Sequence, residues 1–322
     1  MLGAVLALAS AAFFGLNNAA LRRGVVKGSV LQAIAITVPL GVPIFVGLAA
    51  LMGGFEAMAS WDVAAWVWMI LAGIIHFVVG RFGNYKTTQL LGATLSTPVQ
   101  QLSILVALVL AFLFLDETVN AVNVVGILLV TVAPTVLLRR RKAATKAGKD
   151  KGFEPQYGPG IFRGGVCALG YGISPLFVAL GIGEGGIADS VGGALVSYVA
   201  ATVVVLIWIA AIGGRASLGR YEEGTKGWFL ISAVFVALSQ FFRYVAMAVA
   251  PVSVVVPIQR LSVVFRLIFG ALINREHEVF DRWVVVSILV SVIGAVLLAA
   301  DTEILLGWVG LPAAPGLTAP LF

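Results

Sequence analysis

The chain has few charged residues, and charge is what the surface of a soluble protein needs. Charged residues make up 11% of its 322 residues and hydrophobic residues 60%, whereas soluble domains carry about 25% charged residues. Apolar runs of about 20 residues, long enough to cross a hydrocarbon core of about 30 Å, recur along the whole chain. The composition therefore predicts an all-α integral membrane protein. The net charge of +6 is attributed to membrane orientation, and nucleic acid is excluded as a partner.

Other scarce residues exclude several kinds of site. The single cysteine, Cys167, rules out an internal disulfide. Two histidines, His76 and His277, cannot form a usual zinc site, and no H-E-x-x-H, nucleophile-elbow or Walker motif occurs. The amino end lacks the basic region and A-x-A site of a cleaved signal, so we expect its first apolar run to remain as a helix. The sequence thus predicts no enzyme, no cofactor and no metal.

Hydropathy divides the chain into ten predicted transmembrane helices, grouped by a basic linker into two units of five. The predicted helices are 2–21, 31–52, 63–80, 93–115, 119–138, 164–182, 191–212, 228–248, 252–273 and 283–300. The predicted parts of the chain are a first five-helix repeat 1–138, a cytoplasmic linker 139–159, a second repeat 160–300 and a tail 301–322.

Positive charge gathers in the segments that follow the odd-numbered predicted helices. These residues are Arg22, Arg23, Lys27, Arg81, Lys86, the run RRRKAATKAGKDK, Arg215, Arg220, Lys226, Arg275 and Arg282. Arg243, near the end of the eighth predicted helix, is the exception. Because basic loops stay in the cytoplasm, both termini are predicted to lie outside.

An internal repeat relates the two halves. A shift of 159 residues places PVQQLS, which begins at Pro98, over PIQRLS, which begins at Pro257, and pairs Glu117 with Glu276. Each half has five predicted helices, an odd number, so the second half must enter the membrane inverted. Inverted repeats with a substrate site at their interface near the midplane are a transporter architecture.

The repeated blocks carry a family resemblance. The runs TPVQQLSILVALVLAFLFLDE and VPIQRLSVVFRLIFGALINRE, with FFGLNN and GYGISP, resemble the EamA-type ten-helix branch of the drug/metabolite transporter superfamily over about residues 2–300. The resemblance implies a carrier of small metabolites, often an exporter, with a central cavity between the halves. We expect a multi-pass protein of the bacterial inner membrane, in contact with lipid, as a monomer or homodimer. Arg260 and Arg266 depart from the family, which usually has apolar or small residues there.

Arg260 lies about nine residues, or about 13 Å, into the ninth predicted helix, near the midplane. Every aspartate and glutamate falls in a loop, in the tail or at a helix end. A guanidinium does not lose its proton, and it costs about 2.5 to 3.5 kcal/mol at a helix centre. Arg260 is therefore predicted to bind a carboxylate or phosphate of the substrate; the alternative is a structural bond to a carbonyl freed by a proline. Arg266 either lines the same pathway or pairs with a helix-end acid.

The other candidate residues lie around the repeated prolines or at matching bends. Pro98 and Pro257 are predicted helix breaks that line the cavity, with ordinary packing kinks as the alternative. The predicted substrate contacts besides the arginines are Gln100, Gln101, Ser103, Tyr244, Gln259, Ser262 and one of Asn17 and Asn18.

His76 is the intramembrane group that would ordinarily titrate near neutrality, so it is a candidate for proton coupling; a structural histidine is the alternative. Glu117 and Glu276 are predicted to be structural, each favouring the first turn of the following helix.

These residues together predict a secondary transporter that moves a small organic metabolite with a carboxylate or phosphate by alternating access. One alternative is a lipid or lipid-headgroup flippase of the same fold, in which Arg260 and Arg266 hold a phosphate. A membrane enzyme is the weaker alternative, because the sequence offers no nucleophile or metal set.

Overall fold

The structure is a computed structural model that describes residues 1–129, 131–132, 156–273, 286, 289–290, 293–294, 297–298 and 319–320. Across these ranges all regular secondary structure is helical. The predicted linker, the tenth helix and the tail fall outside the described residues, apart from the few just named and the last residues before α8.

The first half forms a series of helices that ends in one long rod. Its elements are α1 (Leu2–Lys27), α2 (Val30–Thr37), α3 (Gly41–Leu51), α4 (Gly54–Ala59), α5 (Val63–Gly73), the π-helix η1 (Ile74–Gly80) and α6 (Arg81–Phe114). Residues 121–129 are also helical. The second half comprises α8 (Tyr157–Ile182), α9 (Ile187–Ala211), the 3₁₀ helix η2 (Gly214–Leu218), α10 (Thr225–Met247), α11 (Val252–Gln259) and α12 (Ser262–Ile273).

Seven segments of the described chain are long and apolar enough to cross a membrane. They are Leu2–Val25, Val30–Leu51, Val63–Leu91, Tyr157–Ile182, Ile187–Ala211, Thr225–Met247 and Val252–Gly270. An eighth, shorter apolar helix, Val99–Phe114, corresponds to the fourth predicted span. The all-helical membrane fold agrees with the prediction.

Two predicted basic loops are helical in the structure. Helix α1 continues to Lys27, so the cluster at its end belongs to the helix. Arg81, counted in a cytoplasmic loop, is only 2% exposed and lies where η1 joins α6 without interruption. Hydropathy averaging ends a span at the first polar stretch, but Asn84 and Thr87 are buried inside the bundle. The rod therefore extends beyond the apolar window that predicted it.

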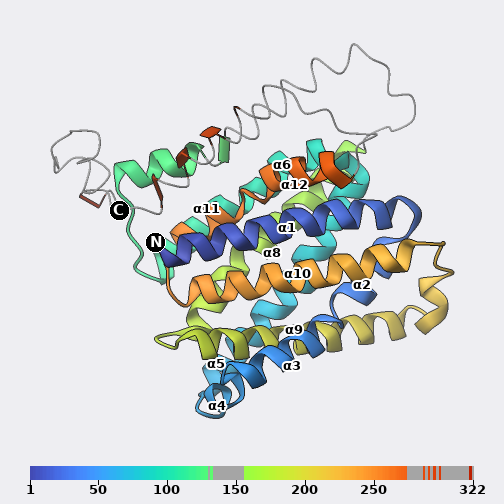
Figure 1. The fold of residues 1–322 in the computed structure, drawn as a ribbon, viewed down its shortest axis with the longest axis horizontal. Helices are drawn as coiled ribbons and strands as arrows, with labels where there is room; N and C mark the ends of the chain where they lie inside the picture. The colour runs from blue at the N-terminus through green and yellow to red at the C-terminus, as the bar shows by residue number, and fades with distance from the viewer. Residues whose placement is uncertain are drawn as a thin grey trace.

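The helices pack as a bundle in which the first helix of each half lies against helices of the other half. In Figure 1, α1 and α10 run side by side along the long axis, and α8 lies behind them against α5, η1 and α6. The Ser10 hydroxyl donates to the Ser239 carbonyl oxygen at 2.8 Å, which joins α1 to α10. Such contacts between small residues let membrane helices approach closely.

The two repeated prolines lie in different local structures. Helix α11 ends at Gln259, two residues after Pro257, and α12 begins at Ser262 after a turn at Arg260 and Leu261. Pro98, predicted to break a helix in the same way, instead lies within the unbroken α6. A membrane helix can keep its course through a proline when local adjustments satisfy the freed carbonyl.

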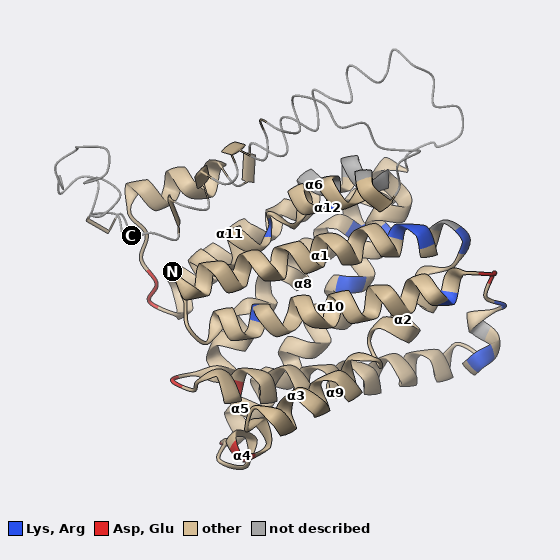
Figure 2. Ribbon diagram, viewed as in Figure 1, with Lys and Arg blue, Asp and Glu red and all other residues tan. Residues whose placement is uncertain are grey.

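Charge divides the bundle into two ends (Figure 2). We call one the basic end; its residues are Arg22, Arg23, Lys27, Arg215, Arg220 and Lys226, and it also carries Glu222 and Glu223. The acidic end comprises Glu56, Asp62, Asp116, Glu117, Glu184 and Asp189.

Glu117 joins the two halves at the acidic end. Its carboxylate accepts hydrogen bonds from the backbone amides of Val252 and Ser253, each at 2.7 Å. These amides open α11, so the expectation that Glu117 favours the first turn of the following helix is wrong: it caps a helix of the other half. A carboxylate at a helix N-terminus satisfies amides that have no partner within the helix and interacts favourably with its dipole. Glu276 lies outside the described residues.

Candidate functional site

A cavity of about 330 Å³ lies among α1, α6, α8 and α12 beside the interruption of the ninth span. Because α11 stops at Gln259, Arg260 leaves the helix in a turn and reaches this space. The lining residues are Phe14, Asn18, Asn84, Gln100, Gln101, Tyr171, Arg260, Ser262, Val263 and Arg266.

Arg260 enters the cavity with no counter-ion among the described residues. Its guanidinium carbon lies 5.2 Å from the centre of the Tyr171 ring, and its buried Nε has no hydrogen-bond partner. Asn84 Nδ2 donates to the Tyr171 hydroxyl at 3.4 Å, which helps to hold the ring. Within the described residues no carboxylate pairs with Arg260. Its charge therefore faces an aromatic ring and the cavity.

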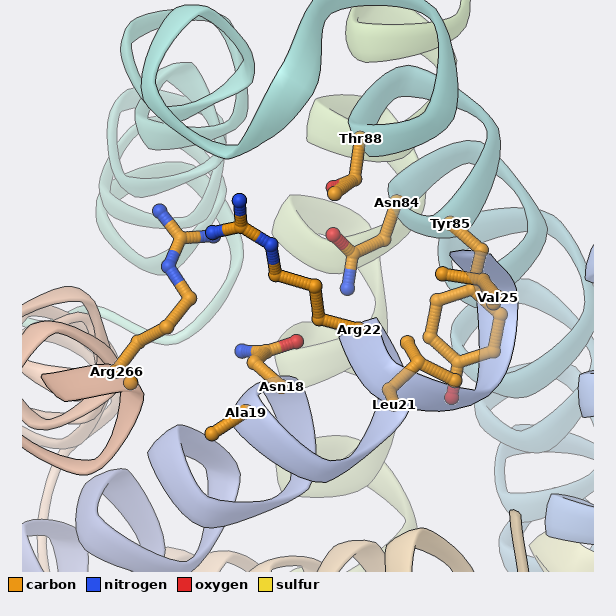
Figure 3. Close-up of a pocket in the computed structure, with 10 residues that line it drawn as sticks. Asn18, Ala19, Leu21, Arg22, Val25, Asn84, Tyr85, Thr88 and Arg266 are labelled. Atoms are coloured by element: carbon orange, nitrogen blue, oxygen red, sulfur yellow. The ribbon is translucent and has the colours of Figure 1, made fainter. Parts of the chain in front are cut away.

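A second cavity, of about 510 Å³, extends from the first toward the basic end. The two share Asn18, Asn84 and Arg266 as lining residues. Figure 3 shows Arg22 from α1 and Arg266 from α12 reaching into this space from different helices. The two cavities form a path from Arg260 toward the basic end, with the side chains of Arg22, Arg260 and Arg266 along it.

We call the cavity that contains Arg260 the inner cavity, and six of the predicted site residues line it. They are Arg260, Arg266, Gln100, Gln101, Asn18 and Ser262. Of the two asparagines, Asn18 faces the cavity, whereas Asn17 is fully buried and accepts a hydrogen bond from the Ser232 hydroxyl at 2.6 Å. The structure thus chooses between the two alternatives left open by the sequence.

Three other predicted contacts bond within the packed helices. Gln259 Nε2 donates to the Ser10 hydroxyl at 3.0 Å, and the Ser103 hydroxyl donates to the carbonyl of Gln100 at 2.7 Å. The Tyr244 hydroxyl donates to Ser197 Oγ at 2.9 Å. These partners give all three side chains a structural role in this conformation, as expected for interhelical hydrogen bonds.

His76 lies in the π-helix η1, on the side that faces α8. Its Nδ1 is 2.7 Å from the Ser174 hydroxyl, and its ring centre is 4.6 Å from that of Tyr171. A π-helical turn is rare and occurs often at functional sites. His76 is thereby connected to the Arg260 site through Tyr171.

Two buried arginines that the hydropathy analysis did not select lie close to this site. Arg81 donates to the Thr37 carbonyl at 3.2 Å and to the Tyr198 hydroxyl at 3.3 Å. Arg243, 1% exposed, donates to Ser174 Oγ at 3.1 Å and to Gln240 Oε1 at 3.3 Å. Neither pairs with a carboxylate in the described part of the chain. The sequence signal for Arg243 was its isolation from the other basic residues.

Comparisons with known proteins found a family that matches part of the chain and a solved structure with a similar fold. Residues 1–139 match the EamA-like transporter family. A crystal structure of another protein, 14% identical, superposes with a TM-score of 0.66 over 92% of this chain and 96% of its own, and this likeness shows the fold alone. No curated protein matches the chain.

The family match covers the stretch that contains α1 to α6, including two of the helices that line the cavities, α1 and α6. EamA-like proteins are transporters and not enzymes. The match over residues 1–139 thus confirms the resemblance to the drug/metabolite transporter superfamily for that part of the chain, and the seven apolar spans of the described residues support a multi-pass membrane protein.

Proposed function

We propose that the protein is a secondary transporter that moves a small organic anion, bearing a carboxylate or a phosphate, by alternating access. The observation that carries this proposal is the Arg260 guanidinium, which lines a cavity inside the bundle with its buried Nε unpartnered and no carboxylate nearby among the described residues.

The hydrogen-bonding groups of the cavity fit an anion. Gln100 Nε2 and Gln101 Nε2 are buried donors without partners, like Arg260 Nε, and all three residues line the same cavity. A buried donor left unsatisfied costs about 1 to 3 kcal/mol, more if charged. Carboxylate and phosphate oxygens accept several hydrogen bonds and form strong, charge-assisted bonds to guanidinium groups. An anionic ligand would satisfy all three donors together.

Alternating access is supported by matched contacts in the two halves. A Cβ at Gly15 of α1 would lie 2.5 Å from Phe265 Cβ, and a Cβ at Gly172 of α8 would lie 2.5 Å from Val106 Cβ. Val106 and Phe265 are separated by the same 159 residues as the sequence repeat. Each half thus places an equivalent glycine against an equivalent helix of the other half.

A second matched pair lies two residues further along each helix. The Asn17 amide oxygen of α1 bonds to Ser232 of α10, and the hydroxyl of Ser174 in α8 bonds to His76 in η1. Asn17 and Ser174 occupy the same place in FFGLNN and GYGISP. Reciprocal contacts of this kind favour two inverted five-helix repeats, the architecture in which one half rocks against the other around a central site.

Binding and transport by the Arg260→Gln variant test the proposal. Succinate and glycerol 3-phosphate serve as anionic probes, with succinamide and glycerol as their neutral counterparts. We expect at least one anionic probe to raise the melting temperature of the wild-type protein, because a ligand that binds the folded state stabilises it. Hydrogen bonds to charged groups contribute about 1.5 to 3 kcal/mol, so Arg260→Gln should weaken binding by about 10-fold to 100-fold.

The control is Lys226→Gln, an exposed basic residue at the start of α10, which should bind the probes like the wild type. Wild-type uptake by Arg260→Gln in proteoliposomes would contradict the anion site. Movement of a phospholipid without movement of either soluble anion would favour the flippase.

A further inference from the structure

We infer that Arg243, together with Gln240, forms the anion contact of the second access state, in which the cavity opens at the acidic end. The inference rests on the proposed function, because it requires alternating access. It adds a second arginine site to the transport path, distinct from the one at Arg260.

Arg243 and Gln240 are both buried, and the Gln240 amide keeps a donor without a partner. Gln240 is 0% exposed, its Oε1 accepts from Arg243 Nη1, and its Nε2 has no partner. Arg243 Nη2 donates to Ser174 Oγ, a neutral hydroxyl. No described carboxylate neutralises the guanidinium. A cation and a free amide donor side by side form the same combination that lines the cavity at Arg260.

The position of this pair differs from that of Arg260 along the membrane normal. Helix α10 begins at Thr225 at the basic end and finishes at Met247, and Arg243 lies about one turn before that finish. The cavities on the basic-end side of Arg260 are lined by other residues, including Asn84 and Arg266. Arg243 therefore occupies the acidic-end half of the bundle.

A continuous series of contacts connects the two arginines. Arg260 lies over the Tyr171 ring, the Tyr171 ring packs on His76, and His76 and Arg243 share the Ser174 hydroxyl at 2.7 Å and 3.1 Å. Aromatic and hydroxyl side chains carry no fixed positive charge, so they can rearrange around a moving anion without holding it in place. The series marks the route by which the ligand would pass from one guanidinium to the other.

The repeat assigns Arg243 the place that Asn84 has in this conformation. The shift of 159 residues that pairs PVQQLS of α6 with PIQRLS also carries Asn84 onto Arg243, and Gln240 lies about one helical turn before Arg243 on α10. Asn84 lines both cavities on the basic-end side. When inverted repeats exchange their conformations, equivalent residues exchange exposure. Arg243, with Gln240 bonded to it, should then line the cavity of the state that opens at the acidic end.

Thiol labelling tests this assignment. The chain has one cysteine, the buried Cys167, so Cys167→Ala gives a cysteine-free background to which Gln240→Cys is added. In vesicles that transport, we expect a membrane-impermeant maleimide to label position 240 from the acidic-end side and not from the basic-end side. Succinate or glycerol 3-phosphate should slow this labelling.

Ser239→Cys in the same background is the matched control. Ser239 is equally buried but bonds to Ser10 of α1, so we expect it to stay unlabelled. Adding Arg243→Gln to the Gln240→Cys protein should raise the probe concentration needed for protection by about 10-fold or more, the loss expected for one charge-assisted hydrogen bond.

Labelling of position 240 only from the basic-end side, no labelling in transporting vesicles, or labelling that neither probe slows would overturn the inference. The proposed function would survive each of these results if Arg260→Gln still weakened anion binding as predicted above. Conversely, Arg260→Gln could bind the probes like the wild type while the probes still protected position 240 from labelling. That result would exclude the anion site at Arg260 and support the one at Arg243 and Gln240.

Discussion

At the scale of single residues, the bundle places three arginine charges away from water, each against an aromatic ring. The guanidinium-to-ring distances are 4.8 Å for Arg81 and Phe77, 5.6 Å for Arg243 and Tyr244, and 5.2 Å for Arg260 and Tyr171. A desolvated cation–π contact contributes about 2 kcal/mol, less than an unpaired buried charge costs. Arg81 and Arg243 add two hydrogen bonds each. Arg260 relies most on whatever occupies the cavity.

The neighbouring asparagines of α1 should separate binding from stability. Asn18→Ala removes a cavity-lining amide, so we expect about 2-fold to 10-fold weaker binding of the anionic probe, the value of one hydrogen bond, with little change in melting temperature. Asn17→Ala leaves the buried Ser232 hydroxyl without its acceptor and should cost about 1 to 3 kcal/mol of stability at unchanged affinity. Thermal melts with and without probe measure both effects. If Asn17→Ala weakened binding and Asn18→Ala lowered stability instead, Asn17 would be the residue that faces the ligand.

The sequence predicted the charged side of the inner cavity but not its full set of arginines. Arg260 stood out because it interrupts an otherwise apolar run, and the repeat placed Gln101 opposite it in the alignment. Arg81 did not stand out, because it follows a glycine at the end of an apolar run and resembles a basic residue in a loop. Whether such a residue lies inside or outside depends on whether the helix continues. Packing against α8 and α9 decides that, and a hydropathy window contains no information about packing.

At the scale of elements, the two members of the repeat have diverged where the ligand would bind. The Pro257 copy stops and restarts around Arg260, whereas the Pro98 copy continues as α6. A discontinuous membrane helix exposes backbone groups and directs side chains into a cavity. Proline spacing predicted both positions but not this difference, because a proline only removes one helical hydrogen bond and its neighbours determine whether the helix ends.

Alanine at the two matched glycines tests the symmetry between elements. Both Gly15→Ala and Gly172→Ala would place a methyl group 2.9 Å or less from backbone of a facing helix, at Arg266 and Ser103 respectively. Overpacking of this kind costs about 1 to 3 kcal/mol, and we expect similar losses in the two variants. Gly165→Ala on α8, where nothing lies within 4 Å, is the control and should melt like the wild type.

Unequal effects would count against equivalent interfaces. If only one of the two glycine variants lost stability while Gly165→Ala remained neutral, the two halves would pack differently, and the support for rocking between inverted repeats would be lost. Unfolding in detergent, followed by size exclusion and thermal melts, measures the comparison.

At the scale of the whole molecule, composition and run length predicted the class of fold well. The low charge content and recurring apolar runs indicated membrane helices, and the seven spans of the described chain agree. The ends of the spans were less predictable. Helix α1 continues to Lys27 because a polar helical turn is stable at the membrane surface, where the exposed side chains of Arg23 and Lys27 reach water.

The orientation of the molecule follows from its two charged ends and can be measured directly. Basic segments remain in the cytoplasm, so we expect the basic end inside and Met1, at the opposite end of α1, outside (Figure 2). Glu184 and Glu222 are both exposed acidic residues, one at each end. In the Cys167→Ala background, an impermeant maleimide added to intact cells should label Glu184→Cys at once and Glu222→Cys only after the membrane is opened. Labelling of Glu222→Cys alone in intact cells would invert the topology, and with it the side from which the Arg260 cavity is filled.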